Sequence, residues 1–389
     1  MSSTETTAPL LTAALIVRDE QHFLPDCLRS LDGVANEVVV VDTGSTDRTC
    51  EIVQEAGARL LHHAWNDDFA AARNVALDAA RGDWILYIDA DERVVGGLPP
   101  GFRDQLRDPH LVGLTVKFKP ATGFTFYREP RLFRRHQEIR FRGVIHETHL
   151  PDLYQVARRE KRVIVHSDLA LEHLGYDGDI SHKHPRNLPL LQARVREEPG
   201  HVYSWWHLGW TLDAMGRPDE AEEAWNKGLD AVRRAWGASS VRSLPYLALL
   251  GHQWARDGDY DQDLWTEAWQ AVPGHPTLLW LKARRLIGRN QWFDAIEPLE
   301  DLTKVDLDEE VARQYATEEQ LFLQWVPASL ALCLFHCERY DEAAALYGEL
   351  ERRFPGEEYR VKKRLAELRG ARLKSSKMES SAQDGASGG

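Results

Sequence analysis

The first part of the chain alternates between short apolar runs and longer segments in which apolar residues recur every three or four positions. Short runs bounded by polar residues or glycine are typical of strands, and the longer spacing is typical of helices. The pattern predicts strands at 11–17, 37–41, 59–62 and 84–88, with helices at 23–31, 47–56 and 69–80 between them. Repeated strand–helix–strand units predict right-handed crossovers and a mostly parallel sheet, hence an α/β domain.

The pattern changes twice further along the chain. Residues 111 to about 173 mix short strand patterns with arginines and aromatics, which predicts a mixed-sheet second half of the same domain. From Ser181 onward, helix hairpins with small residues at the crossings and a proline at the end match a degenerate tetratricopeptide pattern of about 34 residues. The predicted organisation is a disordered N-terminus (1–10), an α/β domain (11–180), an all-α domain of TPR-like repeats (181–372) and a disordered tail (373–389).

Acidic side chains follow two of the predicted strands. Asp42 ends the valine run at 37–41, and Asp89 and Asp91 follow the strand at 84–88. Ligands of open α/β sheets bind outside the carboxyl ends of the strands, so these carboxylates are expected to meet at one edge. Carboxylate oxygens suit Mg²⁺ or Mn²⁺, and such a cation neutralises charge on a departing diphosphate. Asp42 is also a candidate cap for the helix that follows it.

Bulk properties narrow the classes of protein. A formal net charge of −13 argues against a nucleic-acid binder, which needs a clustered basic surface. No apolar run reaches the ~20 residues of a transmembrane helix, and the N-terminus lacks the pattern of a secretory signal. The four cysteines include no Cys-x-x-Cys pair, which favours reduced thiols. The expected location is therefore the cytoplasm.

Three spaced motifs carry a family resemblance. They are Val39-Val-Val-Asp42-Thr-Gly-Ser-Thr-Asp47, then Asp67-Asp-Phe-Ala-Ala-Ala-Arg73-Asn74, then Gly82-Asp-Trp-Ile-Leu-Tyr-Ile-Asp89-Ala-Asp91-Glu92. Together they resemble family 2 glycosyltransferases of the GT-A fold over about residues 11 to 176. The added helical repeats are similar to the branch that includes bacterial peptide cysteine S-glycosyltransferases. One departure is Arg18-Asp19-Glu20, where Lys-Asn-Glu or Tyr-Asn-Glu is common in the family.

The resemblance implies roles for five positions on the donor side. Asp42 would contact the nucleotide base, with the backbone of Val17 close by. Arg73 would reach the base or the diphosphate. Asp89 would approach the ribose, and Asp91 would hold the divalent metal, Mn²⁺ or Mg²⁺.

The acceptor side is expected in the segment Phe141-Arg-Gly-Val-Ile-His146-Glu147. An inverting transfer needs a general base for the acceptor proton, and Glu147 is the first candidate and His146 the second. His146 is also a candidate for a purely structural role. His173 matches a histidine that closes the catalytic domain in related sequences, where it would complete the metal site with Asp91 or serve the structure only.

Other conspicuous residues receive a plainer interpretation. His62-His63 and His182-Lys-His184 have no acidic or cysteine residue at ligand spacing, so they are interpreted as surface histidines. The arginines between Arg128 and Arg135 are expected to be mostly solvated or ion-paired, with one of the four retained as a diphosphate ligand.

The resemblance thus implies an inverting, metal-dependent glycosyltransferase that moves a hexose from a nucleoside-diphosphate sugar, with a UDP-sugar as the expected donor, to a peptide, protein or glycan. The repeats would dock the acceptor or mediate self-association as a homo-oligomer. One alternative is a TPR scaffold with a non-catalytic nucleotide-sugar-binding domain. Another is a sugar nucleotidyltransferase, although Leu15-Ile-Val-Arg-Asp-Glu20 lacks the glycine-rich phosphate loop of that class.

Overall fold

A computed structural model of the chain describes residues 11–175, 181–234, 240–306 and 317–386. The described residues up to 249 form one compact unit, and those from 250 onward form a second. Among the described helices, none combines the length and the apolar character needed to cross a membrane. The predicted disordered N-terminus lies outside the described residues, and the domain boundaries predicted from the sequence stay predictions.

Eight strands of the described residues form one sheet, in the order β3-β2-β1-β4-β7-β6-β8-β5. Strands β1 to β4 are joined by parallel pairings, and the remaining part of the sheet mixes parallel and antiparallel pairs. The strands are β1 (Leu11–Val17), β2 (Glu37–Asp42), β3 (Arg59–His62), β4 (Trp84–Tyr87), β5 (Glu92–Val95), β6 (Leu111–Lys119), β7 (Tyr127–Arg134) and β8 (Val163–His173). The predicted α/β fold with a mostly parallel central sheet is confirmed.

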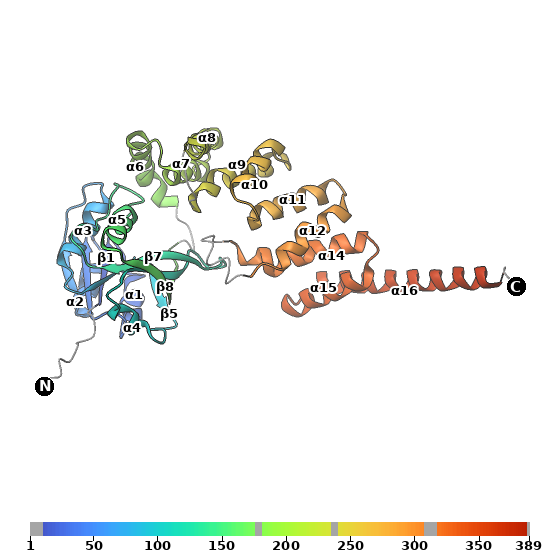
Figure 1. Cartoon of the computed structure of the whole chain (residues 1–389), viewed down its shortest axis with the longest axis horizontal. Coiled ribbons are helices and arrows are strands. Elements are labelled where there is room, and N and C mark those ends of the chain that lie inside the picture. Colours follow the sequence, from blue (N-terminus) through green and yellow to red (C-terminus); the bar gives the residue numbers. More distant parts are fainter. Residues whose placement is uncertain (1–10, 176–180, 235–239, 307–316, 387–389) are drawn as a thin grey trace. The chain divides into compact units, whose positions relative to one another are not determined.

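Helices cover both faces of this sheet (Figure 1). One apolar core joins the sheet to α1 (Leu24–Ser30), α2 (Thr49–Glu55) and α4 (Phe102–Arg107). The other core joins it to α3 (Phe69–Ala79) and α5 (Leu150–Glu160). Burial on both faces explains the continuous valine run of β2, since a strand covered on both sides needs no polar face.

Strand register decides which residues share the functional edge. Val17 pairs with Asp42 at the ends of β1 and β2, and Asp42 pairs with His62 at the ends of β2 and β3. Strand β4 runs parallel to β1 and ends just before Asp89. The carboxyl ends of these parallel strands therefore lie at one edge, as the sequence predicts.

The remaining described helices form hairpins of the TPR-like kind expected from the sequence. Up to residue 257 they are α6 (His184–Glu197), α7 (Val202–Ala214), α8 (Pro218–Arg234) and α9 (Ser243–Asp257), with short helices η1 (Ser181–Lys183) and η2 (Ser240–Arg242). The rest are α10 (Gln262–Ala271), α11 (Pro276–Gly288), α12 (Trp292–Thr303), η3 (Leu321–Trp325), α14 (Val326–His336), α15 (Tyr340–Arg353) and α16 (Glu357–Ala386). Within the second unit, a core of leucine, alanine and aromatic side chains joins α11, α12, α14 and α15 to α16.

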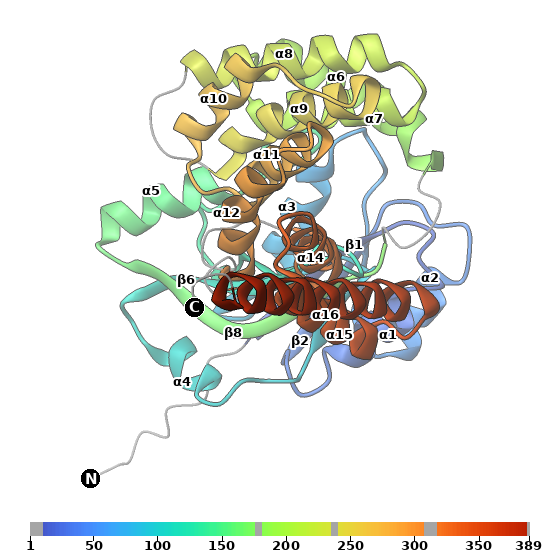
Figure 2. The same ribbon diagram turned by 90° about the vertical axis from the view of Figure 1, so that its right-hand side faces the viewer.

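The last helix differs from the sequence prediction. Helix α16 continues to Ala386, through most of the segment 373–389 predicted to be disordered, and its first part lies along α15 (Figure 2). Tyr359 and Ala366 are buried against the preceding helices, so the helix starts on a packed face. Lysine, methionine, glutamine and alanine, which favour helix, are interspersed among the serines of the tail, so the helical register continues beyond that face.

Candidate active site

Asp42 sits in a tight turn at the end of β2. Its carboxylate accepts hydrogen bonds from the backbone N–H groups of Gly44 (3.1 Å) and Ser45 (3.1 Å), and Gly44 adopts a φ of +110° that a side chain would strain. Burial raises the pKa of Asp42, but the hydrogen bonds from Ser45, Gly44 and His62 outweigh it, and the net pKa is below its ordinary value. Asp42 is thus a buried, charged acceptor, and it stabilises its own turn rather than capping α2, which begins only at Thr49.

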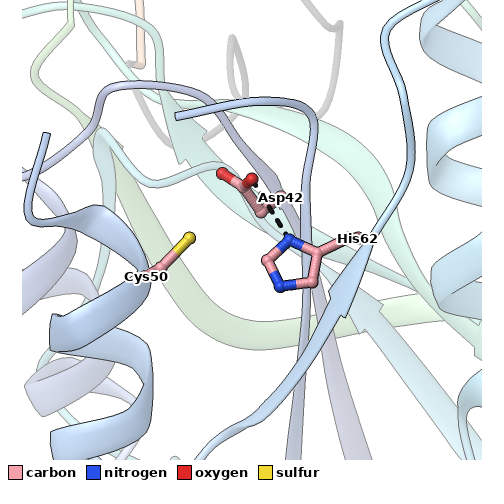
Figure 3. Close-up of side chains that lie close together, drawn as sticks. All are labelled: Asp42, Cys50 and His62. Atoms are coloured by element: carbon pink, nitrogen blue, oxygen red, sulfur yellow. Dashed lines mark ion pairs between the residues drawn. The ribbon is translucent and has the colours of Figure 1, made fainter. Parts of the chain in front are cut away.

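Two further ligand-type side chains lie against Asp42. His62 Nδ1 is 3.4 Å from an Asp42 carboxylate oxygen, and the Cys50 thiol lies on the first turn of α2 (Figure 3). His62 is solvent-exposed, as the sequence predicts, but it does have acidic and cysteine neighbours. The sequence interpretation that no acidic or cysteine residue lies at ligand spacing from His62 is therefore wrong. Strand pairing and a helix turn bring together residues that are far apart along the chain.

Arg73 joins two of the predicted site carboxylates. It lies on α3, whose N-terminus is capped by Asp68, and it is 8% exposed. Its guanidinium donates to Asp89 Oδ1 at 2.8 Å and to Glu147 Oε1. Burial lowers the pKa of Arg73, but the charges of Asp89 and then Glu147 raise it, and it stays cationic. The sequence pattern did not predict this pairing of the donor side with the acceptor side.

We expect Arg73→Met to destabilise the fold by about 3–5 kcal/mol, the usual cost of removing one partner from a buried ion-pair network. The partly buried carboxylates of Asp89 and Glu147 would lose the cationic side chain that they share. Urea unfolding followed by circular dichroism measures the change. The control is Arg48→Met, which breaks exposed pairs with Glu51 and Glu55 and should change stability little. Equal unfolding midpoints for the two variants would contradict this role of Arg73.

Asp91 and His173 meet at the other end of the same edge. Strand β5 begins directly after Asp91, and Glu92 pairs with His173 at the end of β8. His173 Nε2 lies 3.2 Å from Asp91 Oδ2, and its Nδ1 is 2.9 Å from the carbonyl oxygen of Pro120. The Lys183 ammonium is 3.9 Å from the same Asp91 oxygen. Two cationic groups therefore hold the Asp91 carboxylate at a mostly buried position.

Opposite charges shift both members of this pair. Burial raises the pKa of Asp91, but the hydrogen bond and charge of His173 and the charge of Lys183 lower it overall. Burial lowers the pKa of His173, but Asp91 raises it to about 9. A carboxylate oxygen of Asp91 and an imidazole nitrogen of His173 thus face one another with a proton between them. A divalent cation can replace that proton. The donor set fits Mn²⁺, which accepts both oxygen and nitrogen ligands.

Residues 12–163 match the family model of glycosyl transferase family 2. The N-terminal part of the chain is a family 2 glycosyltransferase domain. The chain is 36% identical over 258 residues to a TPR repeat-containing protein of Synechococcus elongatus, covering 64% of this chain and 63% of that protein.

Two other likenesses concern named glycosyltransferases. The chain is 26% identical over 235 residues to the SPbeta prophage-derived glycosyltransferase SunS of Bacillus subtilis, covering 58% of this chain and 54% of that protein. It also resembles a solved glucosyl-3-phosphoglycerate synthase of Mycobacterium tuberculosis in complex with Mn²⁺, uridine diphosphate and phosphoglyceric acid. That likeness has a TM-score of 0.34 and 16% identity, covering 47% of this chain and 76% of that one. The chain thus spans little more than half the length of the two relatives matched by sequence.

The surroundings of the two candidate bases, His146 and Glu147, differ. His146 stacks on His207 of α7 with ring centroids 3.9 Å apart, and its backbone has a φ of +50°. Burial, followed by the charges of His201 and Arg194, lowers the pKa of His146 to about 3. A side chain that binds a proton so weakly is a poor general base near neutral pH. The geometry therefore favours Glu147 over His146 and gives His146 a packing role.

The four arginines of β7 and its end make structural contacts. Arg131 pairs with buried Glu92 at 2.9 Å and lies between the rings of Tyr87 and Phe118, each 4.5 Å from the guanidinium carbon. The others donate to main-chain carbonyl groups: Arg128 to Ser167, Arg134 to Leu111 and Asp108, and Arg135 to Gly82. These contacts fit the ion-paired interpretation of the group, and none of them assigns a diphosphate ligand.

Sequence reasoning missed two residues of the glycosyltransferase domain's edge. Burial, and then the negative charge of Asp91, raise the pKa of Glu20 to about 7, so Glu20 lies near Asp91. Lys183, interpreted as part of a surface segment, reaches Asp91. Its neighbour His184 is buried against Trp210 rather than exposed, which corrects the surface interpretation for that histidine. The sequence feature that could have identified Glu20 as a site residue is its position just after the first strand.

Gly175 lies directly against the Asp91 carboxylate. A Cβ atom placed on it would lie 1.8 Å from Asp91 Oδ2, so Asp91 would have to rotate away from His173. We expect Gly175→Ala to weaken Mn²⁺ binding by about 10–100-fold, as loss of ligand orientation does elsewhere, and to lower stability because the Asp91–His173 pair is disturbed. Titration of Mn²⁺ followed by electron paramagnetic resonance measures the affinity. Gly200→Ala, where nothing lies within 4 Å, is the matched control, and equal Mn²⁺ affinities in the two variants would refute the contact.

The raised pKa of His173 predicts a pH dependence of stability. Its ordinary value is 6.5 and its folded value is about 9, so the folded state binds the proton more tightly than the unfolded state. The resulting stabilisation is complete below pH 6.5 and is lost as the pH rises to about 9. In metal-free buffer, the wild type should therefore lose more stability over this window than His173→Gln. Parallel curves of unfolding midpoint against pH for the two proteins would contradict the Asp91–His173 pair.

Proposed function

We propose that the protein is an inverting, metal-dependent glycosyltransferase that moves a hexose from a UDP-sugar to a peptide, protein or glycan acceptor. One observation carries the proposal. Asp42, Asp89 and Asp91 gather at the carboxyl edge of one sheet, together with Arg73, Glu147 and His173. A scaffold that only binds would not need two carboxylates oriented by one buried arginine.

The donor side is divided among three places on the edge. The Asp42 carboxylate, held by its turn, accepts from the base N–H next to the Val17 backbone. Asp89, fixed by Arg73, accepts from a ribose hydroxyl. Asp91 and His173 hold Mn²⁺ or Mg²⁺, which when bound offsets the negative charge of the departing diphosphate.

The acceptor side requires one proton transfer. The acceptor oxygen or sulfur forms a bond to the anomeric carbon while the bond from that carbon to the diphosphate oxygen breaks. Glu147 takes the acceptor's proton, and the nucleoside diphosphate leaves with the electron pair. Arg73 holds Glu147 and Asp89 at fixed positions, so base and donor are oriented by one side chain. Attack from the side opposite the leaving group inverts the anomeric configuration.

A screen of nucleotide sugars by thermal shift with Mn²⁺ tests the proposal. One or two UDP-sugars should stabilise the wild type, by about 2.7 kcal/mol at a ligand concentration a hundredfold above Kd. The stabilisation should vanish in Asp91→Ala and persist in Asp26→Ala, whose carboxylate pairs with Arg29 on the surface. Release of pyrophosphate would identify a nucleotidyltransferase instead. Binding without turnover of any UDP-sugar, even to water, would favour the scaffold.

A further inference from the structure

A second group of metal-ligand side chains lies at the same sheet edge, apart from Asp91 and His173. Asp42 ends β2, His62 ends the adjacent strand β3, and Cys50 lies on the first turn of α2. One ligand atom from each lies within 4.8 Å of the other two (Figure 3). Within the part of the chain that the structure describes, no other His, Cys, Asp and Glu side chains meet this criterion. Three separate segments thus converge on one point.

The chemistry of this group differs from that of the Asp91 site. A thiolate sulfur, an imidazole nitrogen and a carboxylate oxygen together suit Zn²⁺, whereas Mg²⁺ prefers oxygen ligands alone. Three protein ligands leave the fourth tetrahedral position to water or to a bound molecule. His62 is exposed and Cys50 is partly exposed, so an ion can reach the group from solvent.

The group is also partly oriented before any ion binds. The N–H groups of Gly44 and Ser45 fix the Asp42 carboxylate, and strand pairing places His62 opposite it. His62 Nδ1 already faces a carboxylate oxygen at 3.4 Å, close to the spacing of two ligands on one tetrahedral ion. The other cysteines have different surroundings. Cys27 and Cys333 are buried, and Cys337 is the remaining partly exposed thiol.

We propose that Asp42, Cys50 and His62 form a binding site for Zn²⁺ or another thiophilic cation, and that this site excludes the donor nucleotide. The zinc site stands on the geometry of the three side chains. The exclusion rests on the proposed function, because it assigns the Asp42 carboxylate to the nucleotide base. A cation bound to the Asp42 carboxylate neutralises its charge and occupies acceptor positions on its oxygens, so the cation and the base compete for Asp42 and each weakens the binding of the other. Thiophilic ions would then inhibit transfer through a place distinct from the catalytic cation.

Cobalt substitution in the full chain tests the site directly. Co²⁺ should give the thiolate-to-cobalt absorption band, because Cys50 becomes a ligand. Cys50→Ser should abolish the band and lower Zn²⁺ affinity at least about 100-fold, and His62→Gln should weaken it, while the control Cys337→Ser should match the wild type. Absence of the band, or its persistence in Cys50→Ser, would overturn the zinc site and leave the proposed function untouched, since Asp91 and His173 supply no sulfur.

Competition by uridine tests the exclusion. Uridine carries the base and the ribose but has no phosphate that would chelate cobalt in solution. Its addition should raise the Kd for Co²⁺, measured from the cobalt band of the wild type, and Co²⁺ should raise the Kd for uridine by the same factor. A band that saturating uridine leaves unchanged would overturn the exclusion. Failure of uridine and UDP to bind the Mg²⁺-loaded protein would instead count against the proposed function.

Discussion

Replacing Asp91 by asparagine is expected to lower kcat for glycosyl transfer about a thousandfold. Asparagine keeps the shape of the side chain but removes the charge that holds the cation beside the diphosphate. Loss of about 4 kcal/mol of transition-state stabilisation, within the several kcal/mol that a bound metal supplies, corresponds to that factor. Steady-state release of UDP from the donor found in the screen, measured at saturating Mn²⁺, gives kcat for both proteins.

The control for this prediction separates chemistry from folding. Asp26→Asn removes an exposed carboxylate of α1, paired with Arg29, and should leave kcat and the unfolding midpoint unchanged. Asp91→Asn should remain folded, because its backbone contacts, including the bond from Leu174 N–H to the Asp91 carbonyl, do not need the charge. A folded Asp91→Asn enzyme that retains a tenth or more of wild-type kcat would rule out Asp91 as the cation ligand.

Glu147→Gln should reduce transfer to an alcohol acceptor by about 10²–10⁴-fold, the usual contribution of a general base. The amide still accepts from Arg73 but takes up no proton. Binding of UDP should be unchanged, because Asp42, Asp89 and Asp91 are intact. A thiol acceptor should suffer less, since thiols lose their proton more readily. Measuring both kcat and the affinity for UDP with each acceptor distinguishes loss of the general base from loss of nucleotide binding.

His146→Gln is the matched comparison for Glu147→Gln. The two residues are adjacent, but the pKa of His146 is about 3 and its ring stacks on His207. We expect the His146 variant to lose packing and some stability while kcat at a permissive temperature changes little. A larger loss of kcat in His146→Gln than in Glu147→Gln would reverse the assignment of the base.

The sequence predicts the sheet and its functional edge because both depend on local signals. The valine run before Asp42 and the apolar run before Asp89 mark buried strands, and parallel strands place their carboxyl ends together. These local patterns place Asp42 and Asp91 at that edge without any information on side-chain contacts. Strand β5 and helices α4 and α5 lacked comparably strong patterns, and their positions emerge only in the fold.

Contacts between distant segments could not be predicted in this way. The Arg73 bridge depends on how α3 and the loop carrying Glu147 approach each other, a separation of 74 residues. Spacing along the chain does not reveal the group of Asp42, Cys50 and His62, because strand pairing and a helix turn bring these residues together. The stacking of His146 on His207 of α7 likewise follows from the fold alone, and burial there lowers the pKa of His146 to about 3.

A crystal of the full chain grown with UDP and Mn²⁺ tests the central claim most directly. Anomalous diffraction locates manganese without reference to the surrounding side chains. We predict the manganese peak at direct coordination distance from the Asp91 carboxylate and His173 Nε2, with the uracil against Asp42 and the diphosphate between them. Manganese away from Asp91, or UDP bound outside the edge formed by the ends of β1, β2 and β4, would contradict the account.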